Sequence, residues 1–280
     1  MAVPRPHVRL GANRQPRIGD PAVSNIETTL DDGVFTITLA DEANRNALSI
    51  QLLTDLLAAI DRADTDDEIR VVVLTNRGHI FSAGADLRER SNPEVSGSTV
   101  DMATVFGRIR QSPKPFVGRI AGHAIAGGLG LAASLDISIA VEDAKMGFTE
   151  VRLGIAPAII SVICLPKMSR ADAAAAFLQG NRFLAPEAAR LGLINRSVPA
   201  DQLDAVVAQV VADLLLGAPG ALAASKQLLM KIPAMEFDRA LEWATELSAH
   251  LFSGPEGREG MAAYLEKRPP PWAPPNARPD

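Results

Sequence analysis

Two adjacent glycines, Gly127 and Gly128, lie between a short apolar run and a stretch rich in alanine and leucine. The order strand, glycine turn and helix predicts a cluster of free backbone N–H groups, because the first four N–H groups of a helix have no acceptor within it. The helix dipole is positive at that end, and glycine lets a ligand oxygen approach the backbone. The segment therefore indicates a site for an oxyanion: a phosphate, a carboxylate or a polarised thioester carbonyl.

A second turn of small residues lies at residues 81–87, after a continuous apolar run at residues 70–76, and contains Ala85. If the strands before the two turns are neighbours in one sheet, both turns open at the same edge, the usual place for ligands in α/β folds. Two N–H groups that converge on one oxygen form an oxyanion hole, in which each donor contributes about 3–4 kcal/mol of transition-state stabilisation. The alternative is that both turns serve only close packing of the chain.

Hydrophobic periodicity predicts the elements that would position these turns. Residues 26–30 and 34–40 have the pattern of two strands joined by a tight turn. Ser49 is a suitable N-cap for a helix whose leucines recur at helical spacing. The run at residues 70–76 is apolar throughout, which predicts a parallel strand buried on both faces. Strand, helix and strand in this order predict a right-handed crossover.

The later part of the chain changes from strands to helices. We predict a helix at residues 102–111, strands at residues 116–120 and 136–144, and helices for almost all of the chain after residue 169. This order predicts an α/β core with a helical C-terminal portion. The expected organisation is a disordered N-terminal arm at 1–24, a core at 25–200 with a mobile polar loop at 91–99, and a helical C-terminal region with a proline-rich tail at 201–280.

Composition limits the classes of partner. The net charge of −5 over 280 residues argues against nucleic acid as the main partner. No apolar run has the length of a membrane span, so no membrane partner is expected. The single cysteine, Cys164, excludes an internal disulfide and favours a reducing compartment, from which we expect a cytoplasmic protein. Four scattered histidines and one cysteine give no metal-ligand spacing, so neither a metal nor a separate cofactor is expected.

Several segments carry a family resemblance: NRNALS, FSAGADL, GHAIAGGLGLAASLDISIA, TEVRLGI and GREGMAAYLEKRPPPW, in that order. Together they extend over nearly all of residues 25–272, and they resemble the enoyl-CoA hydratase/isomerase (crotonase) superfamily. The resemblance implies an α/β fold with a crotonase-like ββα spiral core and a helical C-terminal trimerisation region. It also implies an acyl-CoA substrate, with coenzyme A as part of that substrate, and self-association as a homotrimer or a dimer of trimers.

The resemblance assigns roles to individual residues. Ala85 and Gly127 would supply the N–H groups that bind the thioester oxygen, and Glu150 would carry the proton. That oxygen gains negative charge when the α-carbon loses or gains a proton, so fixed dipoles beside it lower the barrier. Arg45 and Arg88 would meet the CoA phosphates, the alternative being solvated surface charges. The remaining substrate-binding or CoA-binding positions are Ala83, Asp86, Leu87, Gly128, Tyr264 and Lys267.

The proton-transfer residues depart from the family pattern at one position. Apolar neighbours predict burial of Glu150, which would raise its pKa and suit it to proton transfer; the alternative is a surface glutamate paired with Arg152. Hydratases of this superfamily have a second glutamate shortly after the glycine turn, where this chain has Gly130. Glycine can neither hold water through a charged acceptor nor exchange a proton. His123, in the strand that leads to Gly127, is expected to be a packed or pocket-edge residue rather than a base.

Three functions remain open at this point. The leading hypothesis is hydration of a 2-enoyl-CoA thioester, with the enolate oxygen in the oxyanion hole and Glu150 as proton donor and acceptor. The first alternative is an enoyl-CoA Δ-isomerase, which needs only the carboxylate at position 150. The second is a non-catalytic acyl-CoA binding protein that keeps the oxyanion hole. The segment EVRLGIAPAIIS, together with Gly130, also resembles a bacterial subgroup of methylglutaconyl-CoA hydratase-like proteins.

Overall fold

A computed structural model describes residues 24–91 and 100–274. The predicted N-terminal arm and the predicted mobile loop lie almost entirely outside these residues. A six-stranded sheet forms the centre of the fold, with the strand order β1-β2-β3-β5-β7-β10. Its strands are β1 (Ile26–Asp31), β2 (Val34–Leu39), β3 (Val71–Asn76), β5 (Phe116–Ile120), β7 (Ile137–Val141) and β10 (Arg196–Val198).

The sequence predicted most of this sheet. β1 and β2 form the expected antiparallel hairpin, and its turn has positive φ at Asp32 and Gly33. β3 is buried along its whole length and pairs in parallel with β2 and β5, as predicted from its continuous apolar run. β7 is shorter than the predicted strand at residues 136–144, because the chain turns after Val141.

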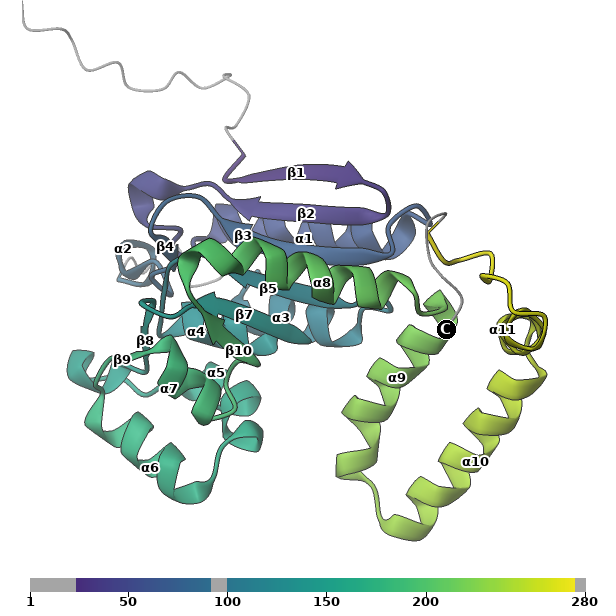
Figure 1. The fold of residues 1–280 in the computed structure, drawn as a ribbon. Coiled ribbons are helices and arrows are strands. Elements are labelled where there is room, and N and C mark those ends of the chain that lie inside the picture. Colours follow the sequence, from purple (N-terminus) through teal and green to yellow (C-terminus); the bar gives the residue numbers. More distant parts are fainter. Residues whose placement is uncertain (1–23, 92–99, 275–280) are drawn as a thin grey trace, which may run out of the picture.

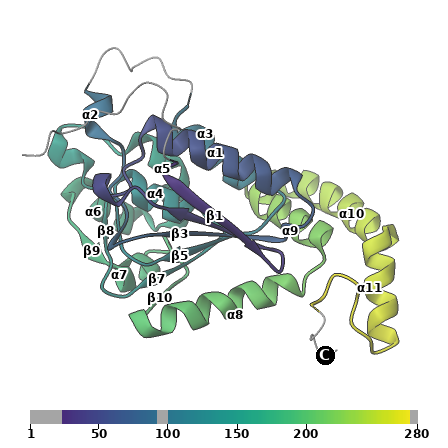
Figure 2. The ribbon, with the colours of Figure 1, turned by 90° about the horizontal axis from the view of Figure 1, so that it is seen from above.

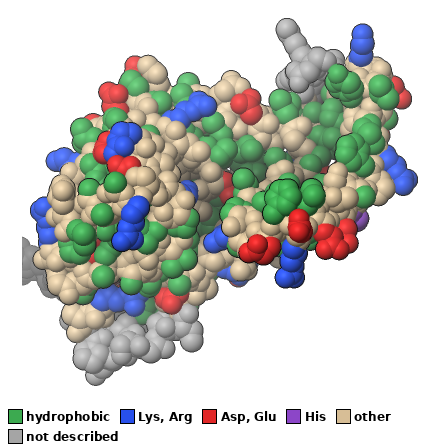
Figure 3. Space-filling model, turned by 90° about the horizontal axis from the view of Figure 1, so that it is seen from below, with side chains coloured by type: hydrophobic (Ala, Val, Ile, Leu, Met, Phe, Trp, Pro, Cys, Tyr) green, Lys and Arg blue, Asp and Glu red, His purple; other side chains and the backbone are tan. Residues whose placement is uncertain are grey.

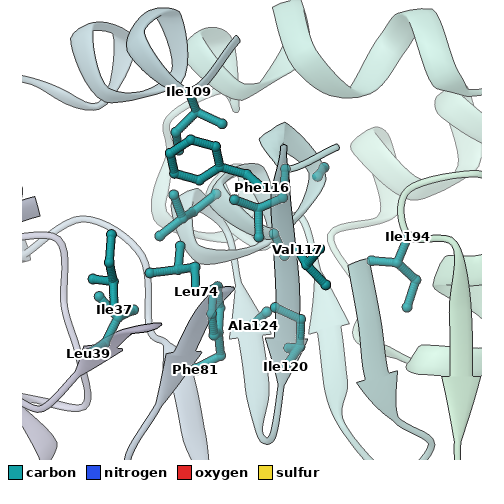
Figure 4. Close-up of a cluster of buried hydrophobic side chains, with 14 of the residues drawn as sticks. Ile37, Leu39, Leu74, Phe81, Ile109, Phe116, Val117, Ile120, Ala124 and Ile194 are labelled. Atoms are coloured by element: carbon teal, nitrogen blue, oxygen red, sulfur yellow. The ribbon is translucent and has the colours of Figure 1, made fainter. Parts of the chain in front are cut away.

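Helices cover both faces of the sheet (Figures 1 and 2). α1 (Ile50–Thr65) and α3 (Met102–Gln111) pack on one face, and α8 (Leu203–Leu215) packs on β3, β5 and β7 from the other. Ser49 caps α1, since its side chain accepts a hydrogen bond from the Leu52 N–H. The core between these layers is aliphatic with few aromatic rings, among them Phe81 and Phe116 (Figure 4).

A second, smaller sheet was not predicted. It has the order β4-β6-β8-β9 and consists of β4 (Ile80–Ser82), β6 (His123–Ile125), β8 (Lys145–Gly147) and β9 (Phe183–Leu184). The first three strands run parallel, and β9 is antiparallel to β8. The two small-residue turns follow β4 and β6 of this sheet, rather than the long strands β3 and β5 from which we predicted them. Strands of two or three residues carry no measurable periodicity, which is why sequence reasoning missed them.

The remaining helices lie mostly in the second half of the chain. The α-helices are α2 (Leu87–Arg90), α4 (Gly127–Ser134), α5 (Ala158–Cys164), α6 (Arg170–Gln179), α7 (Ala185–Arg190), α9 (Pro219–Lys231), α10 (Phe237–Ser253) and α11 (Pro255–Leu265). Short 3-10 helices occupy Glu42–Asn44, Glu150–Leu153, Leu165–Lys167, Ala200–Gln202 and Ile232–Ala234. In the described part of the chain, no single helix is long and apolar enough to cross a membrane. Helices α8 and α9 reach the length and hydropathy of a membrane span only when they are taken together, and the chain bends by 107° between them.

Helices α9, α10 and α11 form an arm that projects from the core (Figures 1 and 2). A partly buried ion pair holds its first helix against the core: Lys226 Nζ lies 2.7 Å from Asp136 Oδ2 and donates to the Lys114 carbonyl at 2.7 Å. Asp136 also accepts a hydrogen bond from the Phe116 N–H. The arm exposes large apolar side chains, in part visible in Figure 3: Leu229, Phe237, Leu241, Phe252, Met261, Tyr264 and Leu265.

Candidate active site

The turns after β4 and β6 are in direct contact. Gly84 has a φ of +89°, and a Cβ built on it would lie 2.9 Å from the Ile125 carbonyl oxygen and 3.1 Å from the Gly127 nitrogen. A Cβ built on Gly127 would lie 3.5 Å from the Ala85 nitrogen. Neither the Ala85 nor the Gly127 N–H donates a hydrogen bond to another described residue. The structure therefore brings two free backbone donors together, as an oxyanion hole requires.

The loop that contains Arg45 holds the first turn in place. The Leu48 N–H donates to the Gly84 carbonyl at 2.8 Å, and the Ala83 N–H donates to the Arg45 carbonyl at 3.1 Å. Arg45 and Asn46 both have positive φ, 57° and 49°, a conformation that only a few per cent of non-glycine residues adopt. Asn46 is fully buried and donates from Nδ2 to the Ile80 carbonyl at 2.7 Å. This buried amide secures the strained loop against β4.

The second turn begins a helix of very small residues. Ala126 precedes α4 with a φ of +53° and makes no side-chain cap, so the N–H of Gly127 stays free. Gly128 packs against the carbonyl of Ser82 in β4, where a Cβ would overlap that group. Gly128 does not line the cavity described next, so its role is to let α4 approach β4 closely.

Both turns open into one cavity of about 1100 Å³. Eight of the expected site residues line it, from the loop before α1, the turn after β4, α2, the start of α4 and the segment after β8: Arg45, Ala83, Ala85, Asp86, Leu87, Arg88, Gly127 and Glu150. Tyr264 and Lys267 belong to the arm and do not line this cavity. The fold thus assembles most of the predicted site from four separate stretches of the sequence, since the turn after β4 runs directly into α2.

Glu150 is the buried carboxyl of this cavity. It begins the 3-10 helix Glu150–Leu153, and only 8% of the residue is exposed. Its Oε2 is buried without a hydrogen-bond partner among the described residues. Burial raises the pKa of Glu150, an effect that the backbone N–H groups of Glu150 and Thr149 partly offset. The alternative of a surface pair with Arg152 is wrong, since Arg152 instead reaches toward the Gln179 carbonyl.

Asp86 lies in the cavity wall and stabilises the start of α2. It caps α2 by accepting hydrogen bonds from the N–H groups of Arg88 and Glu89, and it accepts a third, 2.7 Å long, from Asn44 Nδ2. The Asn44 side chain is the largest cause that lowers the pKa of Asp86. The carboxylate therefore fixes the orientation of α2, from which Leu87 and Arg88 face the cavity.

The cavity carries more positive charge than sequence reasoning predicted. Besides Arg45 and Arg88, four further cations line it: Arg90, Lys145, Arg152 and Arg182. They come from separate segments, and no pattern in the sequence connects them. His123 also lines the cavity, as expected for a pocket-edge residue; its Nδ1 accepts a hydrogen bond from the Lys145 N–H at 3.0 Å. Burial, followed by the charge of Lys145, lowers the pKa of His123.

Gly130 lies in α4, at the position where the resemblance led us to look for a second glutamate. A Cβ at Gly130 would overlap the side chain of Ile160 in α5 and lie 3.3 Å from the Phe106 ring. Ile160 itself lines the cavity. Apolar atoms therefore fill the space next to position 130, and the carboxylates that line the cavity among the described residues are Asp86 and Glu150.

Comparisons with known proteins agree with this geometry. The profile of the enoyl-CoA hydratase/isomerase family matches residues 29–275. A Thermus thermophilus protein provisionally named an enoyl-CoA hydratase is 35% identical over 243 residues, which cover 85% of this chain and 96% of that protein. A Bacillus subtilis protein with the same provisional name is 31% identical over 252 residues, 88% of this chain and 97% of that protein.

The fold is similar to solved structures as well. The crystal structure of an enoyl-CoA hydratase from Mycobacterium smegmatis has a TM-score of 0.83 and 30% identity to this chain, and the match covers 89% of this chain and 98% of that one. The predicted crotonase fold is thereby confirmed. The chain belongs to the enoyl-CoA hydratase/isomerase family.

Proposed function

We propose that this protein hydrates 2-enoyl-CoA thioesters. One observation carries the proposal: two free N–H groups from contacting turns and a buried carboxyl with an unpartnered oxygen share one cavity. The donors suit an oxygen that becomes negative during the reaction, and the carboxyl suits proton transfer to the carbons beside it. The two relatives named above carry provisional names as enoyl-CoA hydratases, which supports the same reaction.

In the reaction we propose, Glu150 serves first as a base and then as an acid. Its carboxylate accepts a proton from water while the water oxygen bonds to C3 of the substrate. The π electrons of the C2–C3 bond move toward the thioester, whose oxygen becomes an enolate held by the N–H groups of Ala85 and Gly127. The protonated Glu150 then returns the proton to C2, so that one water is added and no cofactor is consumed.

The packing around Gly130 favours a second candidate, an enoyl-CoA Δ-isomerase. Ile160 and Phe106 occupy the space beside position 130, so a second acid is missing from that side of the cavity. An isomerase needs a single carboxyl that removes a proton from C2 of a 3-enoyl-CoA and delivers it to C4, and Glu150 alone can do this. Both reactions pass through an enolate whose oxygen the same oxyanion hole can hold. Hydration adds water at C3, whereas isomerisation only moves a proton from C2 to C4.

Arg45 and Arg88 are the residues that we expect to bind the CoA phosphates. Both are exposed at the cavity and make no ion pair with a described carboxylate. We further propose that Tyr264 and Lys267 contact CoA in an assembly of several copies, a homotrimer or a dimer of trimers. The exposed apolar side chains of the arm support such an assembly, because a surface of this kind marks an interaction site. We expect a cytoplasmic location, on the basis of the single free cysteine.

Two substrates distinguish the candidate functions. The protein is incubated with trans-2-pentenoyl-CoA and, separately, with 3-pentenoyl-CoA, and the ultraviolet absorbance of the conjugated thioester is followed. Loss of absorbance with the first substrate supports hydration, and a gain with the second supports isomerisation. If neither changes while the protein binds CoA thioesters tightly, the chain is an acyl-CoA binding protein and the proposed reaction is wrong.

The assembly has its own test. Light scattering coupled to size-exclusion chromatography should give the mass of three or six copies. Phe237→Glu and Leu241→Glu, which place charges on the exposed face of α10, should reduce that mass. A monomeric wild-type protein would contradict the proposed assembly without affecting the proposed reaction.

A further inference from the structure

Asn46 is a buried amide in the loop before α1, and it does not line the cavity. Its Nδ2 donates to the Ile80 carbonyl at 2.7 Å and, less closely, to the Arg77 carbonyl at 3.3 Å. The amide therefore joins the loop to both ends of the turn that leads from β3 to β4. The proposed function gives Asn46 no part in binding or proton transfer.

The loop around Asn46 is strained. Arg45 and Asn46 have consecutive positive φ values of 57° and 49°, a left-handed backbone that is unfavourable for L-residues. The Oδ1 of Asn46 is also buried without a hydrogen-bond partner among the described residues, and a buried polar atom in this state destabilises a protein. Strain and unpaired polar groups persist mainly where a function requires them. Stability alone therefore does not account for this loop.

The same loop holds the turn that carries the Ala85 donor. The Arg45 carbonyl accepts a hydrogen bond from the Ala83 N–H at 3.1 Å, and the Leu48 N–H donates to the Gly84 carbonyl at 2.8 Å. Leu48 also pairs with Ala85 in an isolated parallel bridge. The loop thus binds the turn at the two residues immediately before the donor.

The hydrogen bond from Leu48 fixes the direction of the Ala85 N–H. The Gly84 carbonyl and the Ala85 N–H belong to one peptide unit, which is planar and trans. In such a unit the C=O and the N–H point in opposite directions. Because the carbonyl points at Leu48, the N–H points away from the loop and stays free for a ligand in the cavity that Ala85 lines. The hydrogen bond to the carbonyl also polarises the peptide and strengthens its N–H as a donor.

The Gly127 donor is oriented by its own helix instead. The Ala126 carbonyl, in the same peptide unit as the Gly127 N–H, accepts a hydrogen bond from the Gly130 N–H at 3.1 Å. Regular hydrogen bonding in α4 therefore directs this donor, whereas the Ala85 donor depends on a loop outside its own turn. A change in that loop should displace one donor and leave the other in place.

We propose that Asn46 is a positioning residue for the reaction and acts through Leu48 on the N–H of Ala85. The proposal rests on the proposed function, because it takes this N–H as one of the two donors to the thioester oxygen. The Asn46 amide anchors the loop to β4, the strand that precedes the donor. Anchored in this way, the loop holds the Leu48 N–H at hydrogen-bonding distance from the Gly84 carbonyl.

Infrared spectroscopy of a bound thioester tests this directly. Pentanoyl-CoA cannot be hydrated, and carbon-13 at its thioester carbonyl separates that stretching band from the protein bands. Two hydrogen bonds in the oxyanion hole should lower the frequency in the wild-type complex. Asn46→Gly removes the amide and tolerates the positive φ, so it should lose about half of this shift. With trans-2-pentenoyl-CoA, kcat should fall about 10- to 100-fold while KM changes less than about threefold.

Asn195→Gly is the matched control. Asn195 Oδ1 accepts a hydrogen bond from the Ser138 N–H at 2.8 Å, and Asn195 does not line the cavity. The control should lower the free energy of unfolding and leave the carbonyl frequency and kcat unchanged. If it lowers both as much as Asn46→Gly does, general destabilisation is the cause and the proposal is wrong. An unchanged frequency in Asn46→Gly overturns the proposal even if kcat falls.

A backbone substitution covers the case in which Asn46→Gly does not fold. Replacing Leu48 by its α-hydroxy acid keeps the side chain and removes only the N–H that donates to Gly84. This ester should also lose about half of the frequency shift. A full shift in the ester would overturn the proposal, because Asn46 is proposed to act through that hydrogen bond.

Failure of the proposed function gives a different result. A wild-type complex without a frequency shift would mean that the oxyanion hole is wrong, and the positioning by Asn46 would be wrong with it. A wild-type shift that Asn46→Gly halves, without any hydration of trans-2-pentenoyl-CoA, would mean that only the reaction is wrong. The positioning of the Ala85 N–H by Asn46 would then stand.

Discussion

Ile160 of α5 occupies the space in which a side chain at Gly130 of α4 would begin. Both residues are buried, and Ile160 also faces the cavity. A branched side chain from another helix therefore leaves no room for a side chain at position 130, and the cavity wall beside it is apolar.

This packing predicts an unusual energetic coupling between the two positions. Gly130→Ala should lower the free energy of unfolding by about 1–3 kcal/mol through overpacking, although alanine favours a helix. In combination with Ile160→Ala, which removes the Cγ2 that a Cβ at Gly130 would overlap, the loss should be smaller than the sum of the single losses by at least about 0.5 kcal/mol. Urea denaturation of the four variants measures this difference. Gly107→Ala, in α3 with open space around it, is the control and should stabilise the protein by about 0.5–1 kcal/mol. Additive effects would mean that the helices move apart to accommodate the methyl group.

Glu150→Gln should remove catalysis and retain binding. The amide has nearly the same shape but cannot exchange a proton, so the turnover rate should fall by about 10²- to 10⁴-fold. The affinity for a saturated acyl-CoA should stay within about threefold, because the oxyanion donors are backbone groups. Glu142→Gln changes an exposed carboxylate nearby and should leave both quantities unchanged. Turnover that survives in Glu150→Gln would assign the proton transfer to another group.

The raised pKa of Glu150 predicts opposite effects of pH on activity and stability. Hydration needs the carboxylate as its base, so turnover should fall as the pH decreases through the raised pKa. Stability changes the other way. The folded protein holds the proton more tightly than the unfolded chain, so ionising Glu150 costs stability as the pH rises from the ordinary glutamate pKa to the raised one.

Comparing the thermal stability of the wild type with that of Glu150→Gln measures the stability that is lost when Glu150 ionises. The variant should melt at a higher temperature than the wild type above neutral pH, and the difference should vanish below the ordinary pKa of glutamate. Scanning calorimetry across that range measures the difference. A constant difference at all pH values would mean that Glu150 titrates alike in the folded and unfolded states.

The contact between the two turns predicts that Gly84→Ala damages catalysis. A methyl group at this position combines a φ of +89° with close approach to the Ile125 carbonyl and the Gly127 nitrogen. The turns must separate, and displacement of one oxyanion donor should lower the turnover rate by about 10²-fold. Gly33→Ala places a methyl group at a φ of +80° in the distant β1–β2 turn. It should lose some stability and keep the wild-type rate; equal rate losses would point to general strain instead of the oxyanion hole.

The sequence predicted those parts of the fold that have a long repeating pattern. α1 shows leucines at helical spacing behind the Ser49 cap, and β3 begins with four consecutive apolar residues, so both were located closely. The turns at Ala85 and Gly127 were expected to meet, and they do meet. Their supports were not predicted, since β4, β6 and β8 are three residues long and have no period to detect.

Other parts of the site depend on pairings between distant segments. Lys145 and Arg182 become neighbours only because β9 pairs with β8, and no local sequence pattern predicts that pairing. The burial of Glu150 was predicted from the apolar residues around it. The obstruction at Gly130 could not be predicted, because it depends on a side chain thirty positions later in the chain.

The proposed oxyanion donors are peptide N–H groups, and this has an evolutionary consequence. A point mutation at Ala85 changes a side chain but leaves its N–H in place, whereas a point mutation at Glu150 removes the carboxyl that we propose transfers the proton. In the proposed function, thioester recognition is inherited with the backbone, and the choice of reaction is carried by exchangeable side chains. A lineage with this turn geometry can pass from one acyl-CoA reaction to another through few mutations, without an intermediate that has ceased to bind its substrate.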